Sequence, residues 1–282
     1  MNFVALASAL SAALANTTAG AASRRIHPSY VLLASSPISL LLIIPAIAIV
    51  GGVPTSASLV WGLVAGVAGV FALSLAFVAL GRGPIGAVTA AIASSQTVLL
   101  TIVGFASGDA VTPARLIALA LCLAAIGLVT YAPGQSLRGN LGGPALGIVV
   151  GLGFACFGLA IAQVDTSERL WPLLPARVVI VVLAIVVALI VRARTAARLD
   201  RTMLTRATVG LVVLAGVFDI ATNVTLLLAL QLSDLTTVGL NTSVSPVFAA
   251  LLGAIFLAER MRPLQIVGLA LAVLGSAVVA LG

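Results

Sequence analysis

Residues 208–230 read TVGLVVLAGVFDIATNVTLLLAL, a run of 23 residues whose one ionisable side chain, Asp219, lies eleven residues from either end. About 20 apolar residues in a helix cross the hydrocarbon core of a bilayer. The run lacks the apolar/polar alternation of a strand. It therefore predicts a membrane-spanning helix that carries one acid at mid-depth.

The composition of the whole chain extends this interpretation. Of its 282 residues, 62% are hydrophobic and 7% are charged, whereas soluble proteins average roughly 45–50% and about 25%. So few charges cannot cover a surface that faces water, which excludes a soluble enzyme, a nucleic-acid binder and a disordered chain. The net charge of +7 comes from 14 arginines that lie mostly between apolar runs, so they are interpreted as determinants of topology.

Ten apolar runs have the length of a membrane span, and the connections between them are short. The sequence therefore predicts an all-α integral membrane protein with ten transmembrane helices and no soluble domain. The alternative for the first run is a signal peptide cleaved at Ala13-Leu14-Ala15, although no basic residue precedes it. The predicted helices are Asn2–Gly20, Ser29–Val50, Leu59–Leu80, Ile85–Ser107, Pro113–Ala132, Leu141–Val164, Leu173–Val191, Thr208–Leu230, Leu235–Leu257 and Pro263–Leu281.

The arginines predict the orientation. The connections after odd-numbered helices hold eleven of them and the opposite side holds three. The positive-inside rule puts the eleven in the cytoplasm and both termini outside. The absence of lysine beside abundant alanine, valine and leucine is typical of a GC-rich bacterial genome, so the bacterial inner (plasma) membrane is the predicted location.

Two parts of the chain resemble each other. Ala79-Leu80 precede a span that ends near Asp109 and is followed by Pro113, and at an offset of 150 Ala229-Leu230 precede a span that ends near Glu259 and is followed by Pro263. This predicts two five-helix repeats, residues 1–135 and 140–282. Since five crossings are an odd number, the second copy starts on the opposite side of the membrane, and inverted repeats of this kind are typical of secondary transporters. Chance similarity among helices rich in Ala, Leu and Val is the alternative.

The last part of the chain resembles the drug/metabolite transporter superfamily in its ten-helix, EamA-type form. The similar segments are residues 238–253 (VGLNTSVSPVFAALLG), residues 257–260 (LAER), and residues 268–271 (GLAL) with Gly275. In the first half Gln96 replaces the helix proline and Asp109 replaces glutamate. The resemblance implies a metabolite carrier, often an exporter of amino acids or similar solutes.

Polar residues inside the predicted spans are the candidates for a substrate site. Asp219 is costly at that depth, and burial favours its protonated form, so it is expected to bind a substrate amine, take up a proton, or do each in turn. Asn223 follows at i+4 on the same face. Hydrogen bonds that hold helices together are the alternative role for all of these residues. The full set of candidate substrate-binding residues is Asp219, Asn223, Asn241, Gln96, Asn16 and Ser245.

Three local features carry further expectations. Pro246 removes a backbone donor and is expected to break the ninth helix, and Ser35-Ser36-Pro37 are expected to break the second. Gly62 with Gly66, and Gly147 with Gly151, are spaced for close helix packing. Arg177 lies one turn inside its helix, and its long side chain is expected to reach the aqueous surface.

The function expected from these features is secondary transport of small polar metabolites by alternating access, around a cavity between helices 1, 3, 4, 6, 8 and 9. Neither a P-loop nor a cluster of metal ligands is found in the sequence, so no ATP drive, cofactor, metal or enzymatic activity is expected. The expected partners are a small-molecule metabolite, protons and membrane lipids, with the chain as a monomer or homodimer. A flippase for a lipid-linked sugar or lipid headgroup and a non-transporting membrane scaffold are the alternatives.

Overall fold

The computed structural model describes residues 3–130, 142–194, 204–232, 238, 245–259 and 262–281. Every regular element in these ranges is a helix, and where a predicted helix is described at both ends, its predicted bounds agree to within three residues. The helices are α1 (Phe3–Ser23), α2 (Pro28–Val50), α3 (Ser56–Arg82), α4 (Ile85–Ala106), α5 (Pro113–Thr130), α6 (Gly143–Ile161), the short η1 (Thr166–Glu168), α7 (Leu173–Arg194), α8 (Arg206–Leu232), α10 (Ser245–Leu257) and α11 (Pro263–Leu281).

These helices have the apolar character of membrane spans. Six of those described, α2, α3, α4, α6, α7 and α8, are long and apolar enough to cross a bilayer, and α5, α10 and α11 contain shorter apolar helices. Large apolar side chains cover the outside of the bundle: Ile49 is 84% exposed and Ile255 is 72% exposed. An apolar surface of this extent is stable against lipid rather than water.

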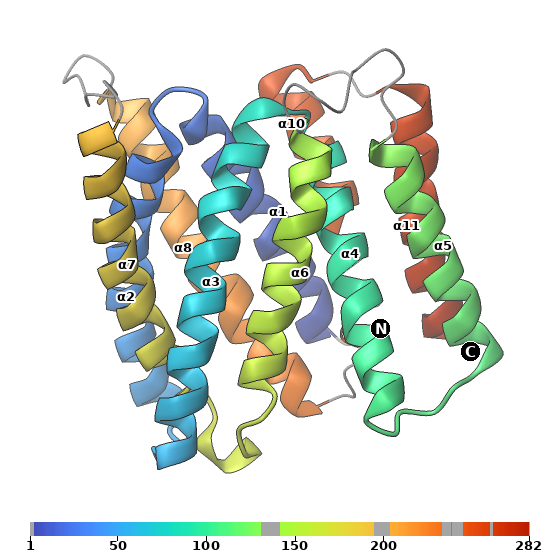
Figure 1. The fold of residues 1–282 in the computed structure, drawn as a ribbon, viewed down its shortest axis with the longest axis horizontal. Coiled ribbons are helices and arrows are strands. Elements are labelled where there is room, and N and C mark those ends of the chain that lie inside the picture. Colours follow the sequence, from blue (N-terminus) through green and yellow to red (C-terminus); the bar gives the residue numbers. More distant parts are fainter. Residues whose placement is uncertain are drawn as a thin grey trace.

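The helices stand side by side, so their connections lie at two opposite ends of the bundle (Figure 1). α2 and α7 pack together at one side and α5 and α11 at the other, with the remaining long helices between them (Figure 1). In this middle part α1 packs against α8 and α10, while α6 packs against α3 and α4. The candidate helices of the predicted cavity therefore form the centre of the protein.

Glycines bring the helices of the middle part close together. On α3, a Cβ at Gly66 would lie 2.6 Å from Val179 Cβ of α7, and one at Gly62 would overlap the carbonyl oxygen of Pro172. On α6, a Cβ at Gly147 would lie 2.9 Å from Val88 O of α4, and one at Gly151 would overlap Ser95 Oγ. The predicted role of these two glycine pairs in close packing is thus confirmed.

The predicted break in the second helix is wrong. α2 runs without interruption from Pro28 to Val50, across Pro37 and Pro45. Ser36 Oγ donates to Leu32 O at 2.7 Å, and α2 is packed against both α7 and α8. Proline is tolerated inside membrane helices because serine hydroxyls and neighbouring helices stabilise the backbone groups that it leaves unpaired.

The connection from α2 to α3 needs glycine for two separate reasons. Gly51 and Gly52 have φ values of +77° and +108°, which residues with a Cβ rarely adopt. A Cβ at Gly52 would also lie 2.8 Å from Glu168 O. Trp171 Nε1 donates to Gly52 O at 3.0 Å, so this connection is fixed to the one between α6 and α7.

Candidate functional site

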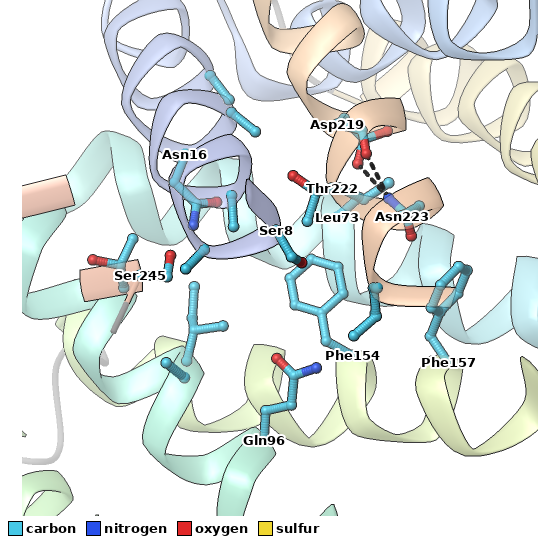
Figure 2. A pocket seen from close by; sticks show the side chains of 18 of the residues that line it. Ser8, Asn16, Leu73, Gln96, Phe154, Phe157, Asp219, Thr222, Asn223 and Ser245 are labelled. Atoms are coloured by element: carbon cyan, nitrogen blue, oxygen red, sulfur yellow. Dashed lines mark hydrogen bonds between the residues drawn. The ribbon is translucent and has the colours of Figure 1, made fainter. Parts of the chain in front are cut away.

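A cavity lies at the centre of the bundle, between α1, α3, α4, α6, α8 and α10 (Figure 2). It contains about 870 Å³ of empty space, which includes the open space at its mouth. Five of the six candidate binding residues line it together. They are Asn16 of α1, Gln96 of α4, Asp219 and Asn223 of α8, and Ser245 of α10. The sixth, Asn241, lies outside the described residues.

Asp219 is held by groups from two neighbouring helices. Its Oδ2 forms an ion pair with Arg177 Nη1 of α7. Ser39 Oγ of α2 lies 3.1 Å from the same oxygen and 2.8 Å from Gly216 O. Since 19% of the Asp219 side chain is exposed, the carboxylate is fixed on one side and open to the cavity on the other.

Asn223 supports the same carboxylate from one turn further along α8. Its Nδ2 donates to the backbone oxygen of Asp219 at 2.7 Å and to Asp219 Oδ1 at 3.2 Å (Figure 2). The two side chains therefore share one face of the helix, as the i+4 spacing predicts. Among the described residues, Asn223 Nδ2 is the only side-chain donor to Oδ1.

The expectation that Arg177 reaches the aqueous surface is wrong. Its side chain is 1% exposed, and its Nε has no hydrogen-bond partner among the described residues. A buried guanidinium is stable only beside an anion, and Asp219 is that anion. The sequence contained the signal, because one arginine and one acid lie inside neighbouring apolar runs and such residues usually pair in membranes.

The other polar groups of the cavity differ in how free they are to bind a ligand. Thr89 Oγ1 donates to Ile85 O at 2.7 Å, and Thr222 Oγ1 donates to Phe218 O at 2.8 Å, so both hydroxyl protons are used within their own helices. The side chains of Asn16 and Gln96 make no hydrogen bond with any described residue, and Gln96 is only 9% exposed. Their amides remain available as donors and acceptors.

Apolar side chains supply much of the remaining wall. Phe154 and Phe157 of α6 lie together on one side of the cavity (Figure 2). Leu73 and Phe77 come from α3, and Ile92 comes from α4. The cavity is thus amphipathic, with one carboxylate, several amides and hydroxyls, and an aromatic wall.

A second ion pair lies at one end of the bundle. Arg24, between α1 and α2, pairs with Glu259, which follows α10. Arg24 Nη2 also donates to Gly83 O at 2.8 Å, and Glu259 Oε2 accepts from Ile85 N, the first residue of α4, at 2.7 Å. We call this contact the Arg24–Glu259 latch, and the end of the bundle where it lies the arginine end.

The latch connects the ends of three helices that line the cavity, α1, α4 and α10. Glu259 is 9% exposed, so its charge is largely shielded from water. A Cβ at Gly253 would lie 2.8 Å from Glu259 Oε2, so the glycine leaves the space that this carboxylate occupies. Sequence reasoning singled out Glu259 for its position in the repeat but not for this contact.

Pro246 is the second described residue of α10. The residues before Ser245, at 239–244, lie outside the described residues, so the break in the predicted ninth helix stays a prediction. In the part of the chain that the structure describes, no three His, Cys, Asp or Glu side chains are grouped as metal ligands.

These features define the class as a multi-pass helical membrane protein with a central small-molecule cavity. Residues 142–281 match the EamA-like transporter family. Across nearly the whole length, the chain is also similar in fold to a crystal structure that has 20% sequence identity and a TM-score of 0.66, with 99% of this chain and 96% of the other covered. No curated protein matches the sequence. The chain belongs to the drug/metabolite transporter superfamily, a superfamily of transporters rather than enzymes.

Proposed function

We propose that this transporter is a secondary carrier of small polar metabolites, amino acids or closely related compounds, that works by alternating access. In this proposal ten helices cross the bacterial inner membrane as two inverted repeats, residues 1–135 and 140–282. The observation that carries the proposal is the central cavity, because it brings together polar residues from both halves of the chain.

The pattern of helix contacts supports the inverted repeat. If α1 to α5 correspond in order to α6, α7, α8, α10 and α11, the contact of α1 with α8 corresponds to that of α6 with α3. The contact of α4 with α6 likewise corresponds to that of α10 with α1, and both the α2–α7 and α5–α11 contacts correspond to themselves. A pseudo-twofold axis exchanges contacts in this way.

The Arg24–Glu259 latch supports alternating access. It joins α1, α4 and α10 at the arginine end, and each of these helices lines the cavity. Breaking the latch would let their ends separate, which is the movement that opens a central site to one side. The arginine content of this end supports a cytoplasmic location for the latch.

Flux into proteoliposomes tests the proposed role of the site. Purified protein is reconstituted, and uptake of radiolabelled amino acids and amines is measured with and without a pH gradient. Asp219→Asn removes the charge of the cavity and is expected to abolish flux or make it independent of pH. Unchanged, pH-dependent flux in this variant would exclude the coupling role of Asp219.

Asp165→Asn is the matched control. Asp165 is an exposed acid at the start of η1, and hydrogen bonds from Ser167 hold the pKa of Asp165 below its ordinary value. The control therefore removes a full negative charge at neutral pH, but one far from the cavity lining. Its flux is expected to equal that of the unmodified protein.

The flippase alternative needs a side opening from the cavity to the lipid. A second cavity lies between α2 and α8, but its lining is mostly apolar, and it shares no residue with the lining of the central cavity.

The scaffold alternative predicts that Asp219→Leu leaves function intact, whereas a carrier loses flux with this change.

A further inference from the structure

We infer that the central site recognises the amino group of its substrate, and that a substrate carboxylate is dispensable. The inference rests on the proposed function, since it names the substrate class that the cavity would carry. It assigns Asp219 as the group that selects the substrate and Arg177 as the residue that positions Asp219. The preferred ligands are amines, or amides and esters of amino acids, that have an apolar body.

The two oxygens of the Asp219 carboxylate are not equivalent. Oδ2 is occupied by the Arg177 guanidinium and by Ser39 Oγ. Oδ1 accepts from Asn223 Nδ2 at 3.2 Å, which is a long hydrogen bond. The oxygen left for a ligand is therefore Oδ1, and a charged ammonium is the donor that binds most strongly to an anionic acceptor.

Among the lining residues that the structure describes, none offers a positive charge to a substrate carboxylate. The lining residues that the structure describes include no arginine or histidine, and the chain contains no lysine. Arg177 contacts Asp219 behind the cavity wall, but it is 1% exposed and already paired. If a substrate carboxylate took Arg177 from Asp219, it would leave one buried anion without its partner, which is unfavourable in a low dielectric.

The remaining lining fits the rest of such a ligand. Phe154 and Phe157 offer apolar surface from α6, opposite α1 and α8 (Figure 2). The free amides of Asn16 and Gln96 can bind a neutral carbonyl or amide of the ligand, which needs no charge. Because Arg177 contacts Oδ2, an ammonium can bind the carboxylate at Oδ1 without displacing the guanidinium.

Thermal unfolding of the purified full-length protein in detergent tests this assignment with four compounds of one skeleton. They are 2-phenylethylamine, L-phenylalaninamide, L-phenylalanine and 3-phenylpropionate. A ligand that binds the native state raises its melting temperature. The amine and the amide are expected to bind about tenfold or more tightly than 3-phenylpropionate, with L-phenylalanine between them and the acid.

Two variants connect the ranking to the ion pair. Asp219→Asn is expected to remove the preference for the amine over the acid, while Asp165→Asn leaves all four shifts unchanged. Arg177→Gln is expected to keep or strengthen amine binding, since Asp219 is then no longer shared, whereas a merely structural pair would lose binding of every compound. If the Arg177→Gln protein does not fold, the ranking of the four compounds and the effect of Asp219→Asn on that ranking decide whether the inference holds.

Three outcomes would overturn the inference: binding of 3-phenylpropionate as tight as that of the amine, tighter binding of L-phenylalanine than of its amide, or no shift with any of the four. None of these three outcomes tests the proposed carrier function, which the flux measurement decides separately. If flux persists and depends on Asp219 while the acid binds best, the protein is a carrier and this recognition is wrong.

Discussion

At the scale of single residues, the pair of Arg177 and Asp219 places two charges inside an apolar bundle. Each charge alone would be strongly unfavourable inside an apolar bundle. Together they are stabilised by their mutual attraction and by Ser39 and Asn223, which satisfy further hydrogen-bonding positions of the carboxylate. The pair also ties α7 to α8, so it contributes to structure and to the site at once.

A double-mutant cycle measures how much the Arg177–Asp219 pair contributes to the stability of the fold. Arg177→Met leaves Asp219 unpaired and is expected to lower the free energy of unfolding by about 3 kcal/mol, at the low end for buried pairs because Asp219 is partly open to the cavity. Arg177→Met with Asp219→Leu removes both charges and is expected to recover most of that loss. Unfolding in a denaturing detergent gives these values and that of Asp219→Leu alone, and a loss in the double variant equal to the sum of the two single losses would contradict the pairing.

At the scale of helices, α6 is positioned by glycine. Its Gly151 meets Ser95 Oγ and the backbone of α4, whereas Gly158, on the same helix, has open space where a Cβ would be. Such closeness allows van der Waals packing and short interhelical contacts, which drive helix association in membranes. Phe154 and Phe157 follow Gly151 on α6, so the position of the aromatic wall depends on this contact.

The two glycines give a matched pair of substitutions. Gly151→Ala is expected to push α6 away from α4 and to cost about 1–3 kcal/mol of stability. Gly158→Ala is expected to be neutral or to stabilise by up to about 1 kcal/mol, because alanine is the better helix former. Melting temperatures of the two purified variants check this difference in stability. Equal melting temperatures would show that the close contact at Gly151 does not determine stability.

The Arg24–Glu259 latch acts between helices and predicts a change in accessibility. Ala19→Cys, in a background where Cys122 and Cys156 are replaced by serine, places a thiol in the cavity lining. Glu259→Gln removes the ion pair and weakens the contact with Ile85 N, so an impermeant thiol reagent added at the arginine end is expected to label this thiol several-fold faster.

Arg25→Ala is the control for that experiment. Arg25 is exposed beside Arg24 and takes no part in the latch, so labelling of the thiol should stay at its original rate. Equal labelling in the Glu259→Gln protein and in this control would exclude the latch as a barrier between the cavity and the arginine end.

At the scale of the whole molecule, the arrangement of charge and symmetry predicts the topology. The proposed inverted five-helix repeats would place both termini on the side opposite the arginine end, and the positive-inside rule predicts that the arginine end is cytoplasmic. Thiols added at each terminus are expected to react with an impermeant reagent in intact cells, whereas one at Arg25 reacts only after lysis. A terminus protected in intact cells would contradict the ten-helix arrangement.

The sequence by itself determined the helices and the membrane class, because the length and apolar character of each run are local properties. It also placed Asn16, Gln96, Asp219, Asn223 and Ser245 among the candidates, because a polar group in an apolar run is costly wherever the helix packs, and all five line one cavity. Their role in binding stays a prediction. The continuity of α2 across Pro37 was not predictable, since it depends on the helices packed around it.

Only the tertiary structure decided which charges meet. Arg177 and Asp219 are 42 residues apart, and Arg24 and Glu259 are 235 apart, so no periodicity within a helix connects them. The energy of an ion pair depends on the distance and burial that packing creates, not on the spacing along the chain. For this reason the sequence pointed to a carboxylate in the membrane, but the fold determined that this carboxylate is paired with Arg177 through one of its two oxygens.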